Sequence, residues 1–242
     1  MDAFDDSAPH AQAPRPDLRG ITSMAMRQVL ADLAIAYRSN TGRGVDVESV
    51  GGVDAARRVA QGEAFDFVVL AADAIDTLAR GGHVVANSAL ALARSGMAIA
   101  VAAGAPHPDI GSEPALRATL LAARSIGYST GPSGRHLLAL LERWDIAATV
   151  APRLVMAAPG VAVGALVARG DAEIGVQQTS ELLPVAGIDI VGALPEGAQQ
   201  ITVFSGAICA QSSHLGACGA WLRFAASTDA VAAKRRQAME PA

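Results

Sequence analysis

The sequence predicts an α/β protein of two lobes, each with a mostly parallel sheet flanked by helices, and a ligand cleft between the lobes. Strand-like and helix-like patterns alternate along the chain, which is typical of parallel sheets covered by helices. The 242 residues are 51% hydrophobic and 17% charged, enough apolar side chain for a sizeable core. No Gly/Ser-rich or Pro-rich linker divides the chain after Asp17, so we expect it to cross between the lobes within strands.

The first half of the chain consists of three strand–helix pairs. Gly42 and Gly44 end the first helix, because glycine readily adopts the left-handed conformation of a helix cap. Gly62 stops the second helix, and Gly81 and Gly82 stop the third. The predicted elements are a strand at 18–22, a helix with its apolar stripe at Met26, Val29, Leu30, Leu33 and Tyr37, a strand at 45–49, a helix at 51–61, a strand at 66–71 and a helix at 73–80.

The second half repeats this alternation and ends in two helices. Its predicted elements are a strand at 97–103, a helix at 113–123, a strand at 125–129, a helix with its stripe at Leu137, Leu140, Leu141 and Trp144, a strand at 153–156, a helix at 161–169, and strands at 173–177, 188–191 and 201–209.

The crossing strands set the expected domain boundaries. The segments 97–103 and 200–207 are the best candidates for crossing between lobes, and they would act as a hinge. Residues 1–17 are predicted to be a flexible tail. The first lobe is then expected at 18–96 together with 205–242, and the second lobe at 97–204.

Charge and cysteine spacing exclude several classes of function. The formal net charge of −4 argues against a nucleic-acid surface, which would show a basic stripe. The two cysteines, Cys209 and Cys218, have no metal-binding spacing, and the sequence leaves open whether they are bonded or free. The apolar run at 88–105 is interrupted by Arg94 and is too short to span a membrane. We therefore expect no metal, no cofactor, no nucleic acid and no membrane insertion.

The start of the chain bears on location. Residues 1–16 are acidic and rich in Pro and Ala, whereas a secretory signal has a basic start followed by an apolar run. The chain as written is expected in the cytoplasm, or in the periplasm if an export signal has been removed. We expect it to be a monomer.

Turns that follow strands and lead into helices indicate an anion site. The first N–H groups of a helix lack internal partners and carry about half a positive charge from the helix dipole. Glycine lets the backbone approach a ligand, and serine or threonine adds a hydroxyl donor. The same residues are also ordinary helix caps, so each turn alone is better explained by capping. Such turns occur at 22–23, 49–52, 128–134, 157–160 and 177–180.

Three side chains near these turns are candidates for ligand binding or proton transfer. Arg135 would bind a carboxylate at two points, or point into solvent. His136 is a candidate proton shuttle or a packing residue, and Glu181 is a candidate base or an ordinary first-turn glutamate. No nucleophile elbow, Walker sequence, dinucleotide-binding glycine motif or zinc-protease motif is present.

Several segments resemble the molybdate-type periplasmic solute-binding proteins, which implies the type II periplasmic-binding-protein fold. The resemblance extends over residues 18–242, and it is carried by the segments 22–30, 33–42, 64–71, 126–134, 166–178 and 233–242. Residues that the resemblance and the turns together mark as ligand-binding are Thr22, Ser23, Ser49, Gly51, Ser129, Ser133, Gly134, Arg135, Pro159, Gly160 and Gln177.

This chain departs from that family at Met24 and at the pair Gln177 and Gln178, so a carboxylate ligand is as well supported as an oxyanion. The first hypothesis is a solute receptor that delivers a small anion to an ABC-type permease. Aconitate isomerase, a distant relative, resembles the same group, so the second hypothesis is a cofactor-free isomerase that moves a double bond in a small carboxylate. A third is a ligand-sensing module similar to the effector domains of LysR-type regulators, although no helix-turn-helix precedes Leu18.

Overall fold

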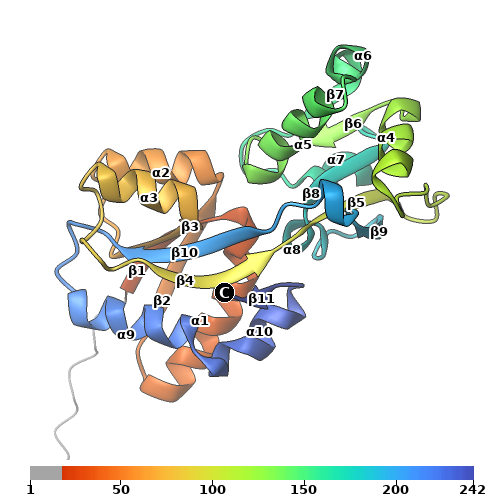
Figure 1. Ribbon diagram of the computed structural model, residues 1–242. Helices are drawn as coiled ribbons and strands as arrows, with labels where there is room; N and C mark the ends of the chain where they lie inside the picture. The colour runs from red at the N-terminus through yellow and green to blue at the C-terminus, as the bar shows by residue number, and fades with distance from the viewer. Residues whose placement is uncertain (1–17) are drawn as a thin grey trace, which may run out of the picture.

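A computed structural model describes residues 18–242, and it confirms the expected α/β fold of two lobes (Figure 1). Each lobe has its own sheet with helices on both faces. The flexible tail expected at 1–17 lies outside the described residues. None of the helices within 18–242 combines the length and the apolar character that crossing a membrane requires.

Within the described residues, the first lobe contains a six-stranded sheet in the order β11-β4-β10-β3-β1-β2. Its strands are β1 (Leu18–Ser23), β2 (Val45–Val50), β3 (Phe67–Ala71), β4 (Leu90–Ser95), β10 (Thr202–Ile208) and β11 (Glu240–Pro241). β1 runs parallel to both β2 and β3, whereas β10 is antiparallel to β3 and β4. The carboxyl ends of β1, β2 and β3 therefore meet at one edge, which faces the second lobe.

Helices cover both faces of this sheet. One face carries α2 (Gly52–Ala60) and α3 (Ala72–Arg80), and the other carries α1 (Arg27–Thr41), α9 (Leu215–Ala226) and α10 (Val231–Arg236), with the short helices η1 (Met24–Met26) and η4 (Thr228–Ala230) (Figure 1). The buried stripe of α1 packs on α9, where Tyr37 meets Trp221 edge to face at 5.3 Å between ring centroids. Gly42, with φ of 70°, ends α1 as expected.

Within the described residues, the second lobe contains a five-stranded sheet in the order β7-β6-β8-β5-β9. Its strands are β5 (Met97–Ala102), β6 (Ile126–Tyr128), β7 (Leu154–Met156), β8 (Ile174–Gln178) and β9 (Ile188–Ala193). Its helices are α4 (Glu113–Ala122), α5 (Pro132–Arg143), α6 (Ala147–Val150), η2 (Ala151–Arg153), α7 (Val163–Ala168), α8 (Thr179–Leu182) and η3 (Glu196–Ala198). β6, β7 and β8 are parallel, so their carboxyl ends also share one edge.

The chain crosses between the lobes at two short links rather than within long strands. The first link is Gly96, between β4 in one sheet and β5 in the other, and the second lies between η3 and β10. Residues 202–204 therefore belong to the first sheet, whereas the sequence assigned them to the second lobe. The strands β4 and β11 were not predicted.

Buried amide side chains hold the two links together. In the orientation that satisfies both ends of its amide, Gln178 donates from Nε2 to the carbonyls of Ser95 and Gly96, at 3.1 and 3.0 Å, and accepts from the hydroxyl of Thr202 at 2.7 Å. Gln178 lies at the end of β8, so this one side chain joins the second lobe to both links. These hydrogen bonds matter because a buried amide without partners would destabilise the folded protein.

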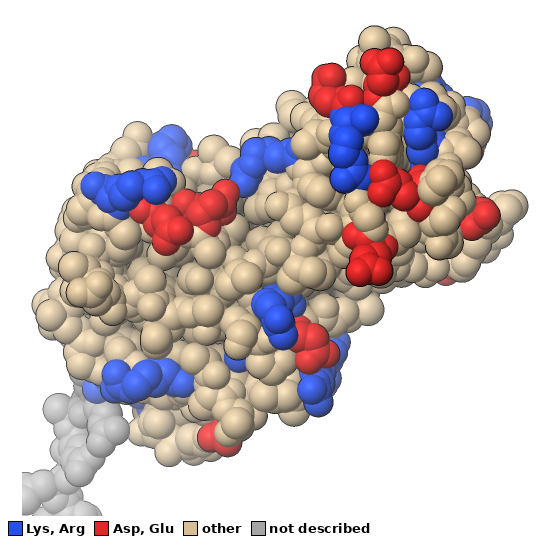
Figure 2. All heavy atoms as spheres, in the orientation of Figure 1, with Lys and Arg blue, Asp and Glu red and all other residues tan. Residues whose placement is uncertain are grey.

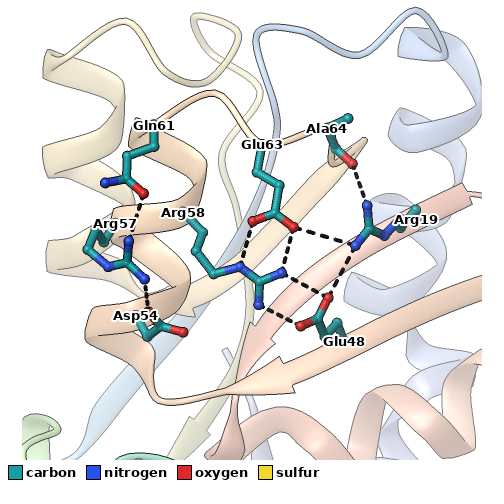
Figure 3. A network of polar contacts seen from close by, with 8 residues as sticks. All are labelled: Arg19, Glu48, Asp54, Arg57, Arg58, Gln61, Glu63 and Ala64. Atoms are coloured by element: carbon teal, nitrogen blue, oxygen red, sulfur yellow. Dashed lines mark hydrogen bonds and ion pairs between the residues drawn. The ribbon is translucent and has the colours of Figure 1, made fainter.

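An ionic network fixes α2 to the strands beneath it (Figure 3). Arg58 bonds to Glu48 on β2 and to Glu63 after the helix, with N–O distances of 2.5 and 2.6 Å. Arg19 on β1 joins the same two carboxylates and lies over the ring of Phe65, 4.5 Å from its centroid. The network holds the carboxyl-terminal end of α2, and so it orients the amino-terminal end that opens on the cleft.

The single lysine of the chain, Lys234 on α10, is buried. Its amine has no hydrogen-bond partner within residues 18–242, and burial lowers the pKa of Lys234. A group whose pKa is lowered by folding binds fewer protons in the folded state than in the unfolded state. The free energy of unfolding therefore falls as pH decreases through the range between the unfolded and folded pKa values.

Replacing Lys234 by methionine is expected to stabilise the protein at pH 7 by about 1–4 kcal/mol, because an unpartnered amine leaves the core. The stabilisation should shrink as pH rises toward the ordinary lysine value, about 10.5. Thermal unfolding from pH 6 to pH 10 measures it, with the neighbouring exposed Arg235→Met as the control. A loss of stability in Lys234→Met at pH 7 would show that the amine has a stabilising partner.

Candidate functional site

A cleft of about 620 Å³ lies between the lobes, at the edges where the parallel strands end. This is the position at which α/β sheets bind ligands. On the face shown in Figure 2, basic and acidic side chains are interspersed and do not form fields of one sign. Residues that line the cleft include Ser23, Met24, Gly51, Gly52, Asp73, Ser129, Thr130, Gly131, Arg135, Pro159, Gly160, Gln177, Gln178, Glu181 and Phe204.

Helix amino termini open on this cleft without side-chain caps. Ser23 begins η1, Gly51 begins α2 and Gly131 begins α5, and none of the three makes a side-chain cap hydrogen bond within the described residues. Among the helices of the described residues only α4 has such a cap, from Ser112, whose hydroxyl accepts from the N–H of Ala115, so a missing cap is not specific to the cleft. Uncapped N–H groups attract anions. The cleft is therefore suited to an anion with several oxygen atoms.

The two residues of the first predicted turn have opposite roles. The side chain of Thr22 is fully buried, and its hydroxyl donates to the carbonyl of Val69 at 2.8 Å, so it holds β1 against β3. Ser23 lines the cleft, and its hydroxyl is buried beside the cleft wall with no partner within the described residues. An orphaned hydroxyl at a pocket wall is the kind of group that a ligand satisfies. Of this pair, only Ser23 is placed to bind.

Glu181, in the first turn of α8, and Asp73 are the acidic side chains that line the cleft within the described residues. Burial raises the pKa of Glu181 to about 7, and the hydrogen bond from Gln177 opposes that rise. The carboxyl group is therefore divided between its acid and base forms near neutral pH. This is the condition under which a side chain both takes and returns protons efficiently.

Both polar atoms of the Gln177 amide have hydrogen-bond partners within the protein. Its Oε1 accepts from the N–H of Val163 at 2.7 Å, and its Nε2 donates to Oε2 of Glu181 at 2.5 Å. Gln177 was predicted to bind the ligand, but in this arrangement its polar atoms are directed to Val163 and Glu181.

Arg135 reaches across the cleft from α5. Its Nη2 donates to Oδ2 of Asp73 on α3, in the other lobe, at 3.0 Å. Both side chains are more than half exposed, so the pair contributes little to stability. Arg135 is the only lysine or arginine that lines the cleft among the described residues. A guanidinium has five donors, so the contact with Asp73 leaves others for a carboxylate.

The second-lobe turns lie opposite Gly51. A Cβ atom added at Gly51 would lie 3.7 Å from the backbone nitrogen of Gly160 and 3.8 Å from Cβ of Pro159. The two lobes therefore already approach each other at this point. Ser129 is also in the wall, where its hydroxyl accepts from the N–H of Gly131 at 3.3 Å and stabilises the turn that begins α5.

Four other candidates do not line the cleft. Ser49 lies within β2, and Ser133 is buried with its hydroxyl 3.3 Å from that of Ser129. Gly134 has a packing role, since a Cβ there would lie 1.6 Å from the carbonyl oxygen of Ser129. His136 donates from Nε2 to the carbonyl of Ala198 at 2.8 Å and so ties α5 to η3. The proton-shuttle hypothesis for His136 has no support from this position.

The cleft residues that the sequence analysis did not mark include Asp73 and Phe204. Asp73 follows β3, a strand parallel to β1, and its turn could have been included with the others on that ground. Phe204 lies within β10, and the alternation of side chains along a strand does not say which set faces the cleft. No group of three or more His, Cys, Asp or Glu residues in the described part of the chain is arranged to hold a metal ion.

Comparisons with known proteins agree with this architecture. The family model described as "Bacterial extracellular solute-binding protein" matches residues 18–240. The chain is 37% identical over 239 residues to an aconitate isomerase from a Pseudomonas species, a match that covers 96% of this chain and 90% of that protein. The resemblance found in the sequence is thus confirmed.

Solved structures show the same fold at low sequence identity. The Azotobacter vinelandii periplasmic molybdate-binding protein superposes with a TM-score of 0.77 at 17% identity, covering 92% of this chain and 98% of that one. The sulfate-binding protein of Mycobacterium tuberculosis superposes with a TM-score of 0.73 at 17% identity, covering 94% of this chain and 87% of that one. These structures are type II periplasmic binding proteins, so the predicted fold type is confirmed.

Ser23→Ala is expected to weaken anion binding while leaving the melting temperature of the free protein unchanged or raised, because the hydroxyl has no partner to lose. The matched Thr22→Val variant should keep its anion affinity but lose about 1 kcal/mol of stability, because it removes the hydrogen bond to the carbonyl of Val69. Thermal unfolding with and without sulfate or citrate measures both effects. Unaltered anion affinity in Ser23→Ala would remove this residue from the site.

Proposed function

Because the chain belongs to the family of bacterial extracellular solute-binding proteins, we propose that it closes its cleft on a small organic anion, and that it isomerises this anion by proton transfer. The proposed substrate class is a di- or tricarboxylate with a carbon–carbon double bond, of the aconitate type. The observation that carries the proposal is Glu181, a carboxyl group in the cleft whose pKa is about 7.

A largely buried carboxyl group in the wall of an anion cleft is better explained by chemistry than by binding alone. Like charges in a desolvated space repel, so an ionised Glu181 lowers affinity for an anion. A receptor gains nothing from this repulsion. A proton-transfer catalyst needs such a group, because a general base is most effective when its pKa lies near the working pH. The 37% identity to an aconitate isomerase supports the same conclusion.

The proposed step is a proton shift within one molecule. The Glu181 carboxylate takes a proton from the methylene carbon between a carboxylate and the double bond. The electron pair of that C–H bond forms the new double bond, and the former double-bond pair moves to the far carbon. Protonated Glu181 returns the proton to that carbon. No atom is gained or lost and no co-substrate is consumed, so one carboxyl group suffices if it reaches both carbons.

The cleft also offers groups to hold the substrate carboxylates. The uncapped amino termini of α2 and α5 and the hydroxyl of Ser23 provide neutral donors. Arg135 supplies the positive charge. As the C–H bond breaks, negative charge spreads toward the carboxylates, and donors fixed in advance stabilise that charge. Two carboxylates held at opposite ends would place the carbon chain over Glu181.

A second function is favoured by the family match itself. A solute receptor for an ABC-type importer would bind the anion in this cleft and pass it to a permease without changing it. This candidate expects tight binding and no turnover. The two candidates share the ligand class and differ in what the protein does to the ligand.

Glu181→Gln is expected to reduce turnover by about 10²–10⁴-fold, because the base is lost, while substrate affinity is kept or increased, because a like charge is removed. NMR spectra of cis- and trans-aconitate with protein would follow turnover, and deuterium entering the methylene position in D₂O would report proton exchange. The exposed Glu142→Gln on α5 makes the same change in charge outside the cleft and should behave as the wild type.

The pH dependence gives an independent check. Only the ionised carboxyl can start the reaction, so kcat/KM of the wild type should fall about tenfold per pH unit below a midpoint near 7. Binding of both aconitate isomers without turnover at any pH would reject the isomerase and leave the receptor.

Arg135→Lys should weaken carboxylate binding by about tenfold or more, because an ammonium cannot make the two-point contact of a guanidinium. Isothermal titration with citrate, a non-reacting tricarboxylate, measures this loss. Arg143→Lys on the same helix, which bonds to Glu113 outside the cleft, is the matched control. Equal affinities in the two variants would exclude Arg135 from carboxylate recognition.

A further inference from the structure

The amide of Gln177 can take only one orientation. Its Oε1 lies 2.7 Å from the N–H of Val163, the first residue of α7, and a backbone N–H only donates. Reversing the amide would direct its NH₂ group at that N–H. The group presented to Glu181 is therefore the NH₂ donor, at 2.5 Å from Oε2.

The position of Gln177 makes this arrangement rigid. The residue lies near the carboxyl end of β8, in the middle of the five-stranded sheet, and its side chain is about 1% exposed. Val163 belongs to the helix that packs against this sheet, and α8, which carries Glu181, follows β8 directly. One buried side chain therefore joins the strand, the helix and the carboxyl group, and each of its two polar atoms already has a partner within the protein.

A donor facing one carboxyl oxygen has two consequences for Glu181. It stabilises the ionised form, which opposes the effect of burial. It also occupies Oε2 and leaves Oε1 as the oxygen free to meet a substrate, since the described residues offer Glu181 no second side-chain hydrogen bond.

We propose that Gln177 is a positioning residue for the base: by donating to one oxygen of Glu181, it fixes which oxygen of that carboxyl faces the cleft. The inference rests on the proposed function and deepens it. It also reassigns Gln177, which the sequence marked as a ligand-binding residue, to a role that acts through Glu181.

Two variants of Gln177 separate the effect of its NH₂ donor on Glu181 from the effect of its packing. Gln177→Met keeps the length of the side chain and removes both polar ends. Gln177→Glu keeps an acceptor for Val163 and replaces the donor by a second acceptor, so it tests the idea if the methionine variant does not fold. Gln178→Met is the matched control, because that neighbouring amide is also buried but bonds to the hinge links instead of Glu181.

The first readout does not depend on activity. Carbon-13 NMR of labelled glutamate carboxyl groups would follow the titration of Glu181, whose signal is identified by its loss in Glu181→Gln. Removing the donor should move the midpoint upward by about one pH unit in Gln177→Met. Gln177→Glu should move it in the same direction, and Gln178→Met should leave it unmoved.

The second readout is the pH profile of kcat/KM with aconitate. The acid limb should shift upward with the carboxyl midpoint, and activity should recover toward the wild-type value at high pH. An unmoved carboxyl midpoint in both Gln177 variants overturns the inference. So does a KM raised equally at every pH, because that result assigns Gln177 to substrate binding. Failure of the proposed function looks different: the wild type does not turn over aconitate, while the NMR shift still reports whether Gln177 controls Glu181.

Discussion

The cleft depends on one geometric constraint, which is that parallel strands end together. In the first lobe β1, β2 and β3 finish at one edge, and in the second lobe β6, β7 and β8 do the same. Each strand then turns into a helix, so helix amino termini collect where the lobes face each other. This arrangement supplies N–H donors without positive side chains. It explains how a chain of net charge −4 can present a site for anions.

Within that environment, Glu181 is held between two opposing effects. Removing a carboxyl group from water favours its neutral form, and a hydrogen bond to an oxygen favours the ionised form. Burial alone would favour the protonated carboxyl at neutral pH, whereas several hydrogen-bond donors would stabilise the carboxylate so much that it became a weak base. In Glu181 one donor, Gln177, opposes burial, and the pKa of the carboxyl lies near neutral pH. Fold alone does not decide between transport and catalysis, and this local balance is the observation on which the proposed isomerase rests.

Much of the fold could be predicted from the sequence because it rests on periodicity and glycine. The α1 stripe and the Gly42 cap are local signals, and they sufficed for the alternating α/β pattern. The sequence analysis missed the strand β4 because Arg94 interrupts its apolar run, and it missed β11 because that strand is only two residues long. Of the candidate site, the turns and Glu181 were found by residue type. The difference between Thr22 and Ser23 was not, since alternation along a strand does not say which side chain faces which way. The pairing of Gln177 with Val163 joins residues on separate elements, and no local pattern reveals it.

The hydrogen bonds of Thr179 at the start of α8 have a mechanical consequence. Its N–H and its hydroxyl both donate to the carbonyl of Gly96, at 3.0 and 3.1 Å, and α8 also contacts η1 of the opposite lobe. Glu181 lies two residues further along α8, so it is anchored close to the link between the lobes. Displacement in a rigid rotation grows with distance from the axis. If the lobes rotate about the Gly96 link, Glu181 would therefore move less than groups far from that link.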